Sequence, residues 1–252
     1  MSQASIHHRP TDLPYRDERC QLACAFRWAA RLNFHEGIAN HFSLAVSDDG
    51  SQFLMNPNAR HFSQIRASEL MLLDANDDTT MQQANTPDPT AWDLHGAVHR
   101  KVPQARCILH VHSKYATVLA SLADSSMPPI DQNTMRFYER VAIDDGFDGM
   151  GLGAEAERVC QQFGNQPILL MGNHGVMVTG HSVAQAFDEL FYFERACETL
   201  ITARMTGQPL RIASHEVASK TARQWTEYPD IGENHFRELM AILDREEPEY
   251  KH

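Results

Sequence analysis

The chain has 252 residues, 42% of them hydrophobic, and its formal net charge is −11. This length supplies one sizeable hydrophobic core, so we expect a single domain with extensions. An acidic chain without a dense stripe of lysine and arginine excludes nucleic acid and anionic membrane surfaces as general partners. Its apolar runs are also far too short to span a bilayer.

The first residues are polar and contain no apolar stretch of the kind that a secretory signal needs. We therefore expect residues 1–17 to form a disordered arm. The cysteines are odd in number and dispersed, namely Cys20, Cys24, Cys107, Cys160 and Cys197. This favours small buried side chains in a reducing compartment over a disulfide framework, so we expect a cytoplasmic protein.

Hydrophobic periodicity and turn signals predict the elements in chain order. They are a helix over 16–32, a hairpin of strands over 40–46 and 52–55, a short strand over 67–73, a helix over 89–100, a strand over 107–112, helices over 113–122 and 155–163, a strand over 168–171 that continues through 176–178, a long helix over 183–205, and a helical tail over 219–246. Hairpin strands mixed with alternating helices predict an α/β sandwich with a mixed, partly antiparallel sheet.

Three histidines on apolar runs are the main candidates for chemistry. His110 and His112 alternate on the strand 107–112 and therefore point to the same face. His174 ends a second apolar run. A single histidine on such a strand is more often a satisfied core residue, but each of two buried imidazoles needs a polar partner. Three imidazoles that converge form an open metal site, so the spacing predicts metal-dependent chemistry.

Several motifs in this order resemble the class II aldolase/adducin family over roughly residues 18–210. The motifs are Asn40-His41-Phe42-Ser43, Asn56-Pro57, Pro89-Thr90-Ala91, the segment from Leu109 to Thr117, the segment from Leu170 to Val176, and Phe193-Glu194-Arg195-Ala196. The resemblance implies a three-layer α/β/α sandwich with a mixed, largely antiparallel central sheet. Residues 211–252 are then a helical C-terminal extension that packs on the domain or on a neighbouring subunit.

The resemblance also implies that His110, His112 and His174 bind a divalent metal cation, most often zinc. The cation stabilises the enediolate that forms when a carbon–carbon bond breaks. The chain is therefore expected to be a metal-dependent, aldolase-like lyase of a small hydroxy-carbonyl compound, or a related epimerase or decarboxylase. The alternative is a non-catalytic, adducin-like module that binds a protein partner.

One departure from the family concerns proton transfer. The aldolases carry a glutamate for this purpose at the start of a helix, where Ala91 stands in this chain, and alanine cannot transfer a proton. His95 shares the helix face of Ala91 and is a candidate catalytic residue, although a packing role is its simpler interpretation. His41 replaces an asparagine of the family's glycine–asparagine loop, and it is a candidate base or anion ligand, or a structural loop residue.

A second departure concerns the substrate. The candidate substrate-binding residues are Asn40, Ser43, Thr90 and Asn173. The phosphate-binding site of the family is incomplete in this chain, because Pro89 has no N–H and Ala59 stands where a glycine is usual. A carboxylate is therefore at least as suitable as a phosphate, and the candidate anion partners are Arg60, His61 and Arg136, for which a solvent-facing role is the default.

The resemblance finally implies a homotetramer in which residues near 129–138 and from the tail complete a neighbour's active site. Tyr138 and Tyr228 are then candidate proton donors, and ordinary packing is the simpler interpretation of Tyr138. The glycine-rich run 146–153 lacks the context of a phosphate-binding loop. We expect it to be a loop near the pocket.

Overall fold

The structure is a computed structural model that describes residues 13–83, 85–149 and 155–252. Residues 1–12 of the predicted arm lie outside the described residues, and helix α1 begins at Arg16. The helices are α1 Arg16–Arg31, α2 Pro89–Lys101, α3 Lys114–Ala120, α4 Gln132–Arg136, α5 Glu155–Phe163, α6 Val183–Met205, α7 His215–Glu227 and α8 Ile231–Glu246. The 3₁₀ helices are Phe62–Gln64, Ala67–Glu69, Thr80–Gln82 and Pro248–Lys251.

Within the described residues, seven strands form one sheet in the order β3-β2-β1-β4-β7-β6-β5. The strands are β1 His41–Ala45, β2 Gln52–Met55, β3 Met71–Asp74, β4 Cys107–Val111, β5 Val141–Asp144, β6 Ile168–Met171 and β7 Gly175–Gly180. Neighbouring strands are antiparallel except β5 and β6, which are parallel. The sheet is therefore mixed and largely antiparallel, as predicted.

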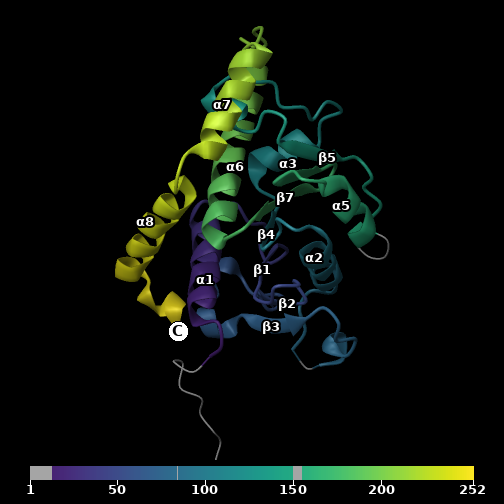
Figure 1. Cartoon of the computed structure of the whole chain (residues 1–252), viewed down its shortest axis with the longest axis vertical. Helices are drawn as coiled ribbons and strands as arrows, with labels where there is room; N and C mark the ends of the chain where they lie inside the picture. Colours follow the sequence, from purple (N-terminus) through teal and green to yellow (C-terminus); the bar gives the residue numbers. More distant parts are fainter. Residues whose placement is uncertain (1–12, 84, 150–154) are drawn as a thin grey trace, which may run out of the picture.

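Helices cover both faces of the sheet (Figure 1). Helices α1, α3, α6 and α8 share one hydrophobic core with one face of the sheet, and α2 and α5 share a second core with the other face. Strand side chains alternate between the two cores: Leu109 and Val111 of β4 point to the first, and Ile108 points to the second. This arrangement is the predicted three-layer α/β/α sandwich.

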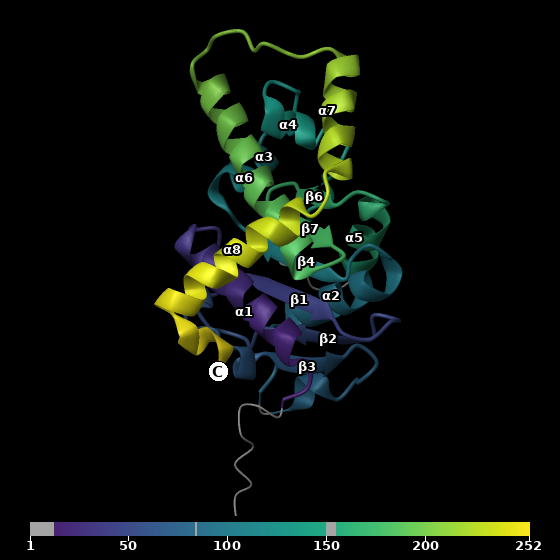
Figure 2. The same cartoon turned by 60° about the vertical axis from the view of Figure 1, so that its left-hand side comes forward.

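The C-terminal segment packs on the same chain. Helix α6 extends beyond the sheet, α7 lies beside α4 at that end, and α8 returns along α6 and α1 (Figure 2). The indole of Trp28 in α1 donates a hydrogen bond of 2.9 Å to the carbonyl of Leu239 in α8. No helix among the described residues combines the length and the apolar character that crossing a bilayer requires.

Three predicted elements differ from the structure. The segment 67–73 begins as a 3₁₀ helix, and its strand is Met71–Asp74. The chain reverses after His174, so β6 and β7 form an antiparallel hairpin instead of one continued strand. The tail divides into α7 and α8, because Pro229 cannot continue a helix and Asp230 adopts a left-handed φ of 53°. Strand β5 and the short helix α4 were not predicted at all.

Candidate metal centre

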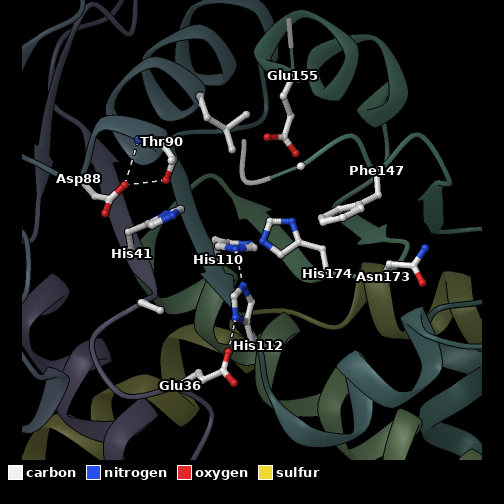
Figure 3. A pocket seen from close by; sticks show the side chains of 13 residues that line it. Glu36, His41, Asp88, Thr90, His110, His112, Phe147, Glu155, Asn173 and His174 are labelled. Carbon is white, nitrogen blue, oxygen red and sulfur yellow. Dashed lines mark hydrogen bonds and ion pairs between the residues drawn. The ribbon is translucent and has the colours of Figure 1, made fainter. Parts of the chain in front are cut away.

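The three predicted metal ligands meet at one point in the fold. His110 lies in β4, His112 follows the end of that strand, and His174 lies in the turn between β6 and β7. One ligand atom from each residue lies within 4.8 Å of the other two. The rings converge on the floor of a pocket (Figure 3). We call these residues the histidine triad.

Hydrogen bonds fix which nitrogen of two triad rings carries the proton. Nδ1 of His110 lies 3.1 Å from the carbonyl oxygen of Val176, and a carbonyl can only accept, so this nitrogen donates. Nδ1 of His112 lies 2.6 Å from a carboxylate oxygen of Glu36 and donates to it. In the neutral rings both Nε2 atoms are therefore unprotonated. A carboxylate behind a metal-binding histidine is the usual partner that orients the ring.

The two unprotonated Nε2 atoms of His110 and His112 lie only 3.2 Å apart. Two acceptors gain no hydrogen bond from each other, whereas a metal ion between them would bind both lone pairs. Nitrogen ligands at about 2.1 Å from a tetrahedral zinc ion are about 3.4 Å apart. Nδ1 of His174 is buried and has no hydrogen-bond partner among the residues that the structure describes. The side chains therefore fit a divalent transition-metal ion.

The charge state of the triad suits a metal as well. Burial lowers the pKa of His174 to about 4, and burial lowers the pKa of His110 well below its usual range. At neutral pH both rings are neutral, which is the form that binds a metal.

The backbone around His174 explains why asparagine and glycine flank it. A Cβ atom on Gly175 would lie 2.6 Å from the carbonyl oxygen of Val111 and 2.8 Å from Cδ2 of His112. Only glycine therefore allows β7 to approach β4 closely enough to bring His174 to the other two ligands. Asn173 adopts a left-handed φ of 55°, which asparagine tolerates better than most residues.

A pocket of about 420 Å³ opens over the triad. Besides the triad it is lined by Glu36, Ala39, His41, Asp88, Thr90, Leu94, Phe147, Gly149, Glu155 and Asn173. Phe147 and Gly149 confirm that the glycine-rich loop lies near the pocket, although residues 150–153 of that run lie outside the described residues. Asp88 caps α2 and accepts hydrogen bonds from the backbone N–H and the hydroxyl of Thr90, at 2.9 and 2.6 Å.

A chain of buried side chains leads from the pocket into the core behind it. His41 is paired with His110 in the register of β1 and β4, and the two rings stack with centroids 4.8 Å apart. Nδ1 of His41 lies 2.7 Å from Nε2 of His95, and Nδ1 of His95 lies 2.5 Å from the hydroxyl of Ser43. The same hydroxyl lies 2.7 Å from Nε2 of His99. We call these four residues the buried polar chain.

The far end of the buried polar chain sets the proton positions along it. Nδ1 of His99 lies 2.7 Å from the carbonyl oxygen of Ala105 and must donate to it. Nε2 of His99 therefore accepts from Ser43, Ser43 accepts from His95, and His95 accepts from His41. Burial lowers the pKa of both His41 and His99 to about 4, so the rings are neutral. His41 thus presents an unprotonated Nε2 on the pocket side of the chain.

The buried imidazoles predict an acid-sensitive fold. His99 takes up a proton in the unfolded chain below about pH 6.5, whereas burial lowers its folded pKa to about 4. The unfolded state binds more protons in this window, so the free energy of unfolding falls as the pH falls from about 6.5 toward 4. Between pH 7 and pH 5 we expect His99 alone to account for a loss of about 2 kcal/mol. Urea unfolding of the metal-free protein at both pH values measures it.

The matched variants isolate His99 from the other histidines. His99→Gln removes this titrating group, so its stability difference between pH 7 and pH 5 should be smaller than that of the wild type by about 2 kcal/mol. His215→Gln removes an exposed imidazole and should leave the difference unchanged. An unchanged difference in His99→Gln would contradict the neutral, buried state of this ring.

Comparison with known proteins identifies the family of this chain. The family described as "Class II Aldolase and Adducin N-terminal domain" matches residues 20–201, which is more than half of the chain. The chain belongs to the class II aldolase and adducin family. Class II aldolases of this family use a divalent metal ion and act on small molecules, and the histidine triad is placed to bind such an ion.

The similar proteins have diverse functions. Decarboxylase NovR of Streptomyces niveus is 27% identical over 232 residues, which cover 87% of this chain and 85% of that protein. Human beta-adducin is 26% identical over 247 residues, which cover 90% of this chain but only 33% of the adducin. An aldolase II superfamily protein from Pseudomonas syringae has a TM-score of 0.86 at 27% identity, with 96% of this chain and 98% of that chain covered. L-Fuculose 1-phosphate aldolase from Glaciozyma antarctica PI12 shares the fold, with a TM-score of 0.80 at 18% identity over 99% of this chain and 96% of that chain.

Ala91, which the family resemblance matches to the proton-transfer glutamate, is fully buried. It packs with Phe53, Met55 and Leu73 and does not line the pocket. Phe193-Glu194-Arg195-Ala196, the other family motif on a helix, lies in α6. Glu194 accepts hydrogen bonds from the hydroxyl of Ser113 and from the backbone N–H groups of Tyr115 and Ala116. It therefore caps the N-terminus of α3, directly after His112.

Some predicted site residues do not line the pocket. His95 and Ser43 lie behind His41 in the buried polar chain. The side-chain oxygen of Asn40 accepts from the backbone N–H of Glu36 at 2.7 Å, which holds the turn that carries this carboxylate. The hydroxyl of Tyr138 pairs with His215 at 3.0 Å near α7. Within one chain, then, His41, Thr90 and Asn173 are the predicted catalytic and substrate-binding residues that line the pocket.

The three candidate anion partners have other contacts and do not line the pocket. Arg60 pairs with Glu69 at 2.7 Å, and the side chain of His61 caps the 3₁₀ helix Phe62–Gln64. Arg136 is buried and donates to Asp188 at 2.7 Å. The structure therefore assigns these cations packing and capping roles instead of the anion contacts considered above.

Four residues of the site were not predicted from the sequence: Glu36, Asp88, His99 and Glu155. His99 could have been found, because it follows His95 by four residues and therefore shares its helix face. The other three lie on loops or on another helix, and no periodic signal links them to the triad.

Proposed function

We propose that this chain is a metal-dependent enzyme of the aldolase-like lyase class that acts on a small hydroxy-carbonyl compound. The observation that carries the proposal is the pair of unprotonated Nε2 atoms of His110 and His112, 3.2 Å apart at the floor of a pocket. His174 supplies the third ligand, and the proposed ion is zinc. When bound, the ion stabilises the negative charge that develops on an enediolate.

We assign proton transfer, orientation and substrate binding to other residues in and behind the pocket. His41, whose Nε2 is unprotonated, takes the proton of the substrate hydroxyl group as the base. His95, with Ser43 and His99 behind it, keeps His41 in that tautomer. Thr90 and Asn173 contact the substrate at the rim of the pocket, and Asn40 orients the turn that carries Glu36.

We further propose a cytoplasmic homotetramer in which Tyr138 of one subunit donates a proton in the pocket of its neighbour. Tyr138 does not line the pocket of its own chain, so this role requires a second copy. The cysteines of the described residues are unpaired, which supports a reducing compartment.

Decarboxylation is the closest variant of the proposed reaction, because it also leaves negative charge on a carbon next to a carbonyl group. The name of the Streptomyces niveus relative, Decarboxylase NovR, supports it. The adducin relatives favour a different class, a non-catalytic module that binds a protein partner. The pocket over the triad argues for the enzyme, since a binding module needs no cavity of about 420 Å³ above a metal site.

An exchange experiment tests the common step of the lyase, epimerase and decarboxylase reactions. We expect the zinc-loaded protein in deuterium oxide to exchange the hydrogen on the carbon next to the carbonyl group of dihydroxyacetone, hydroxyacetone or pyruvate. NMR of the small molecule measures the exchange. Chelation of the metal should abolish most of the exchange, by about 10²-fold or more. Metal-loaded protein that exchanges none of the three probes would support the adducin-like module instead.

A further inference from the structure

Glu155 faces the histidine triad from the opposite wall of the pocket. It is the first residue of α5, and its carboxylate points into the cavity above His110 and His174 (Figure 3). The residue is only 7% exposed. A carboxyl group is thus held in the pocket although the family's glutamate position, Ala91, is closed by the apolar core.

The hydrogen bonds of Glu155 leave one oxygen without a partner. Oε1 lies 3.4 Å from a guanidinium nitrogen of Arg158, a long contact, and the buried Oε2 has no hydrogen-bond partner within residues 13–83, 85–149 and 155–252. An unpaired buried polar atom costs about 1–3 kcal/mol. A carboxylate that only stabilised the start of α5 would do so at the surface without this cost, as Glu157 does two residues later, where it is exposed and pairs with Lys101. The unpaired oxygen therefore points to a ligand.

The surroundings favour the protonated form of this carboxyl group. Burial raises the pKa of Glu155, the nearby carboxylate of Asp144 raises it further, and Arg158 opposes both. Across the pocket, the other titratable groups are His41, Asp88, Glu36 and the triad. Two groups with opposite shifts thus line one cavity, a carboxyl group whose pKa is raised by burial and an imidazole whose pKa is lowered by burial, which is the usual arrangement of an acid and a base.

We propose that Glu155 exchanges a proton with the substrate carbon next to the carbonyl group, in place of the glutamate that Ala91 replaces. The proposal rests on the function proposed above. As the carbon–carbon bond breaks, its electron pair passes to the fragment that keeps the carbonyl group. The carboxylic acid of Glu155 gives its proton to that carbon and becomes a carboxylate. In the reverse direction the carboxylate takes the same proton back, so Glu155 acts directly on the hydrogen that the exchange experiment follows.

Glu155→Gln tests the proposal, because glutamine has nearly the same shape and cannot give up or accept this proton. With the zinc-loaded protein and the three probes named above, we expect a loss of exchange of about 10²- to 10⁴-fold. The zinc content should be unchanged, and the melting temperature should be unchanged or higher. The dependence of the exchange rate on pH that the carboxyl group causes in the wild type should disappear. A merely structural role would lower the melting temperature and leave the shape of this profile intact.

Glu157→Gln is the matched control on the same helix and should exchange at the wild-type rate. If Glu155→Gln does not fold, Glu155→Asp, which withdraws the carboxyl group by one methylene, should fold and lose exchange while retaining zinc. A wild-type rate in whichever variant folds would overturn the role of Glu155 and leave the proposed function standing. A wild-type protein that binds zinc but exchanges none of the probes would overturn both.

Discussion

Replacing His110 and His112 together by alanine is expected to lower the zinc content of the purified protein from about one ion per chain to nearly none. The pair supplies two of the three ligands, and their unprotonated nitrogens already lie 3.2 Å apart. A single remaining imidazole binds a divalent ion too weakly to survive purification. We expect any exchange activity to fall by about 10³-fold or more, because the charge on the enediolate loses its neighbouring cation.

Elemental analysis of untagged protein measures the loss of metal. The matched control is His181→Ala/His215→Ala, which removes two exposed imidazoles and should leave the metal content unchanged. Glu36→Gln should have a smaller effect. It keeps the three ligands but weakens the hydrogen-bond acceptor behind His112, so the affinity for metal should fall by about 10- to 100-fold. Equal zinc in the wild type and the double variant would contradict the metal centre.

Replacing Glu194 by alanine is expected to have the largest effect on stability, a loss of about 3 to 5 kcal/mol. Its buried carboxylate accepts the hydroxyl of Ser113 at 2.6 Å and the backbone N–H groups of Tyr115 and Ala116 at 2.8 and 3.0 Å. The variant leaves three donors without a partner at the positive end of the α3 dipole. Because His112 lies next to Ser113, the N-cap residue of this helix, the affinity for metal should fall as well.

Denaturant unfolding of the zinc-free protein measures the loss at Glu194 without a contribution from metal binding. Glu198→Ala, one turn further along α6, removes only a half-buried partner of Arg195 and should change the stability by less than about 0.5 kcal/mol. If the two variants were equally stable, the cap that Glu194 provides would not be a main support of α3.

The sequence alone predicted that the triad binds a metal ion, but it did not predict the contacts that bring the three histidines together. The alternation of His110 and His112 and the apolar runs around them indicated a metal site, because the period of a strand is local information. The sequence could not reveal why glycine follows His174. That reason is the carbonyl of Val111, 2.6 Å from the position of a Cβ atom, on a strand far away in the sequence.

The contacts of the polar residues around the triad could not be predicted from the sequence either. His95 was identified as a candidate because it shares a helix face with Ala91, but its partners on β1, His41 and Ser43, depend on how α2 packs against the sheet. Its neutral state depends on burial, which no local pattern reports. The position of His95 behind His41 agrees with the packing role, its simpler interpretation, and a part in catalysis through the orientation of His41 stays a prediction.

By itself, the sequence predicted the alternating helices and strands of an α/β sandwich and the two strand motifs that carry the ligands. Both follow from periodicity and residue type, which act over a few residues. The family resemblance added the prediction that Ala91 replaces the usual glutamate. Only the tertiary structure decided that β7 turns back on β6, that Glu36 lies behind His112, and that Glu155 enters the pocket from α5. Such contacts join segments whose separation in the sequence carries no signal, and they form because the sheet register and the packing of its two helical layers bring those segments together.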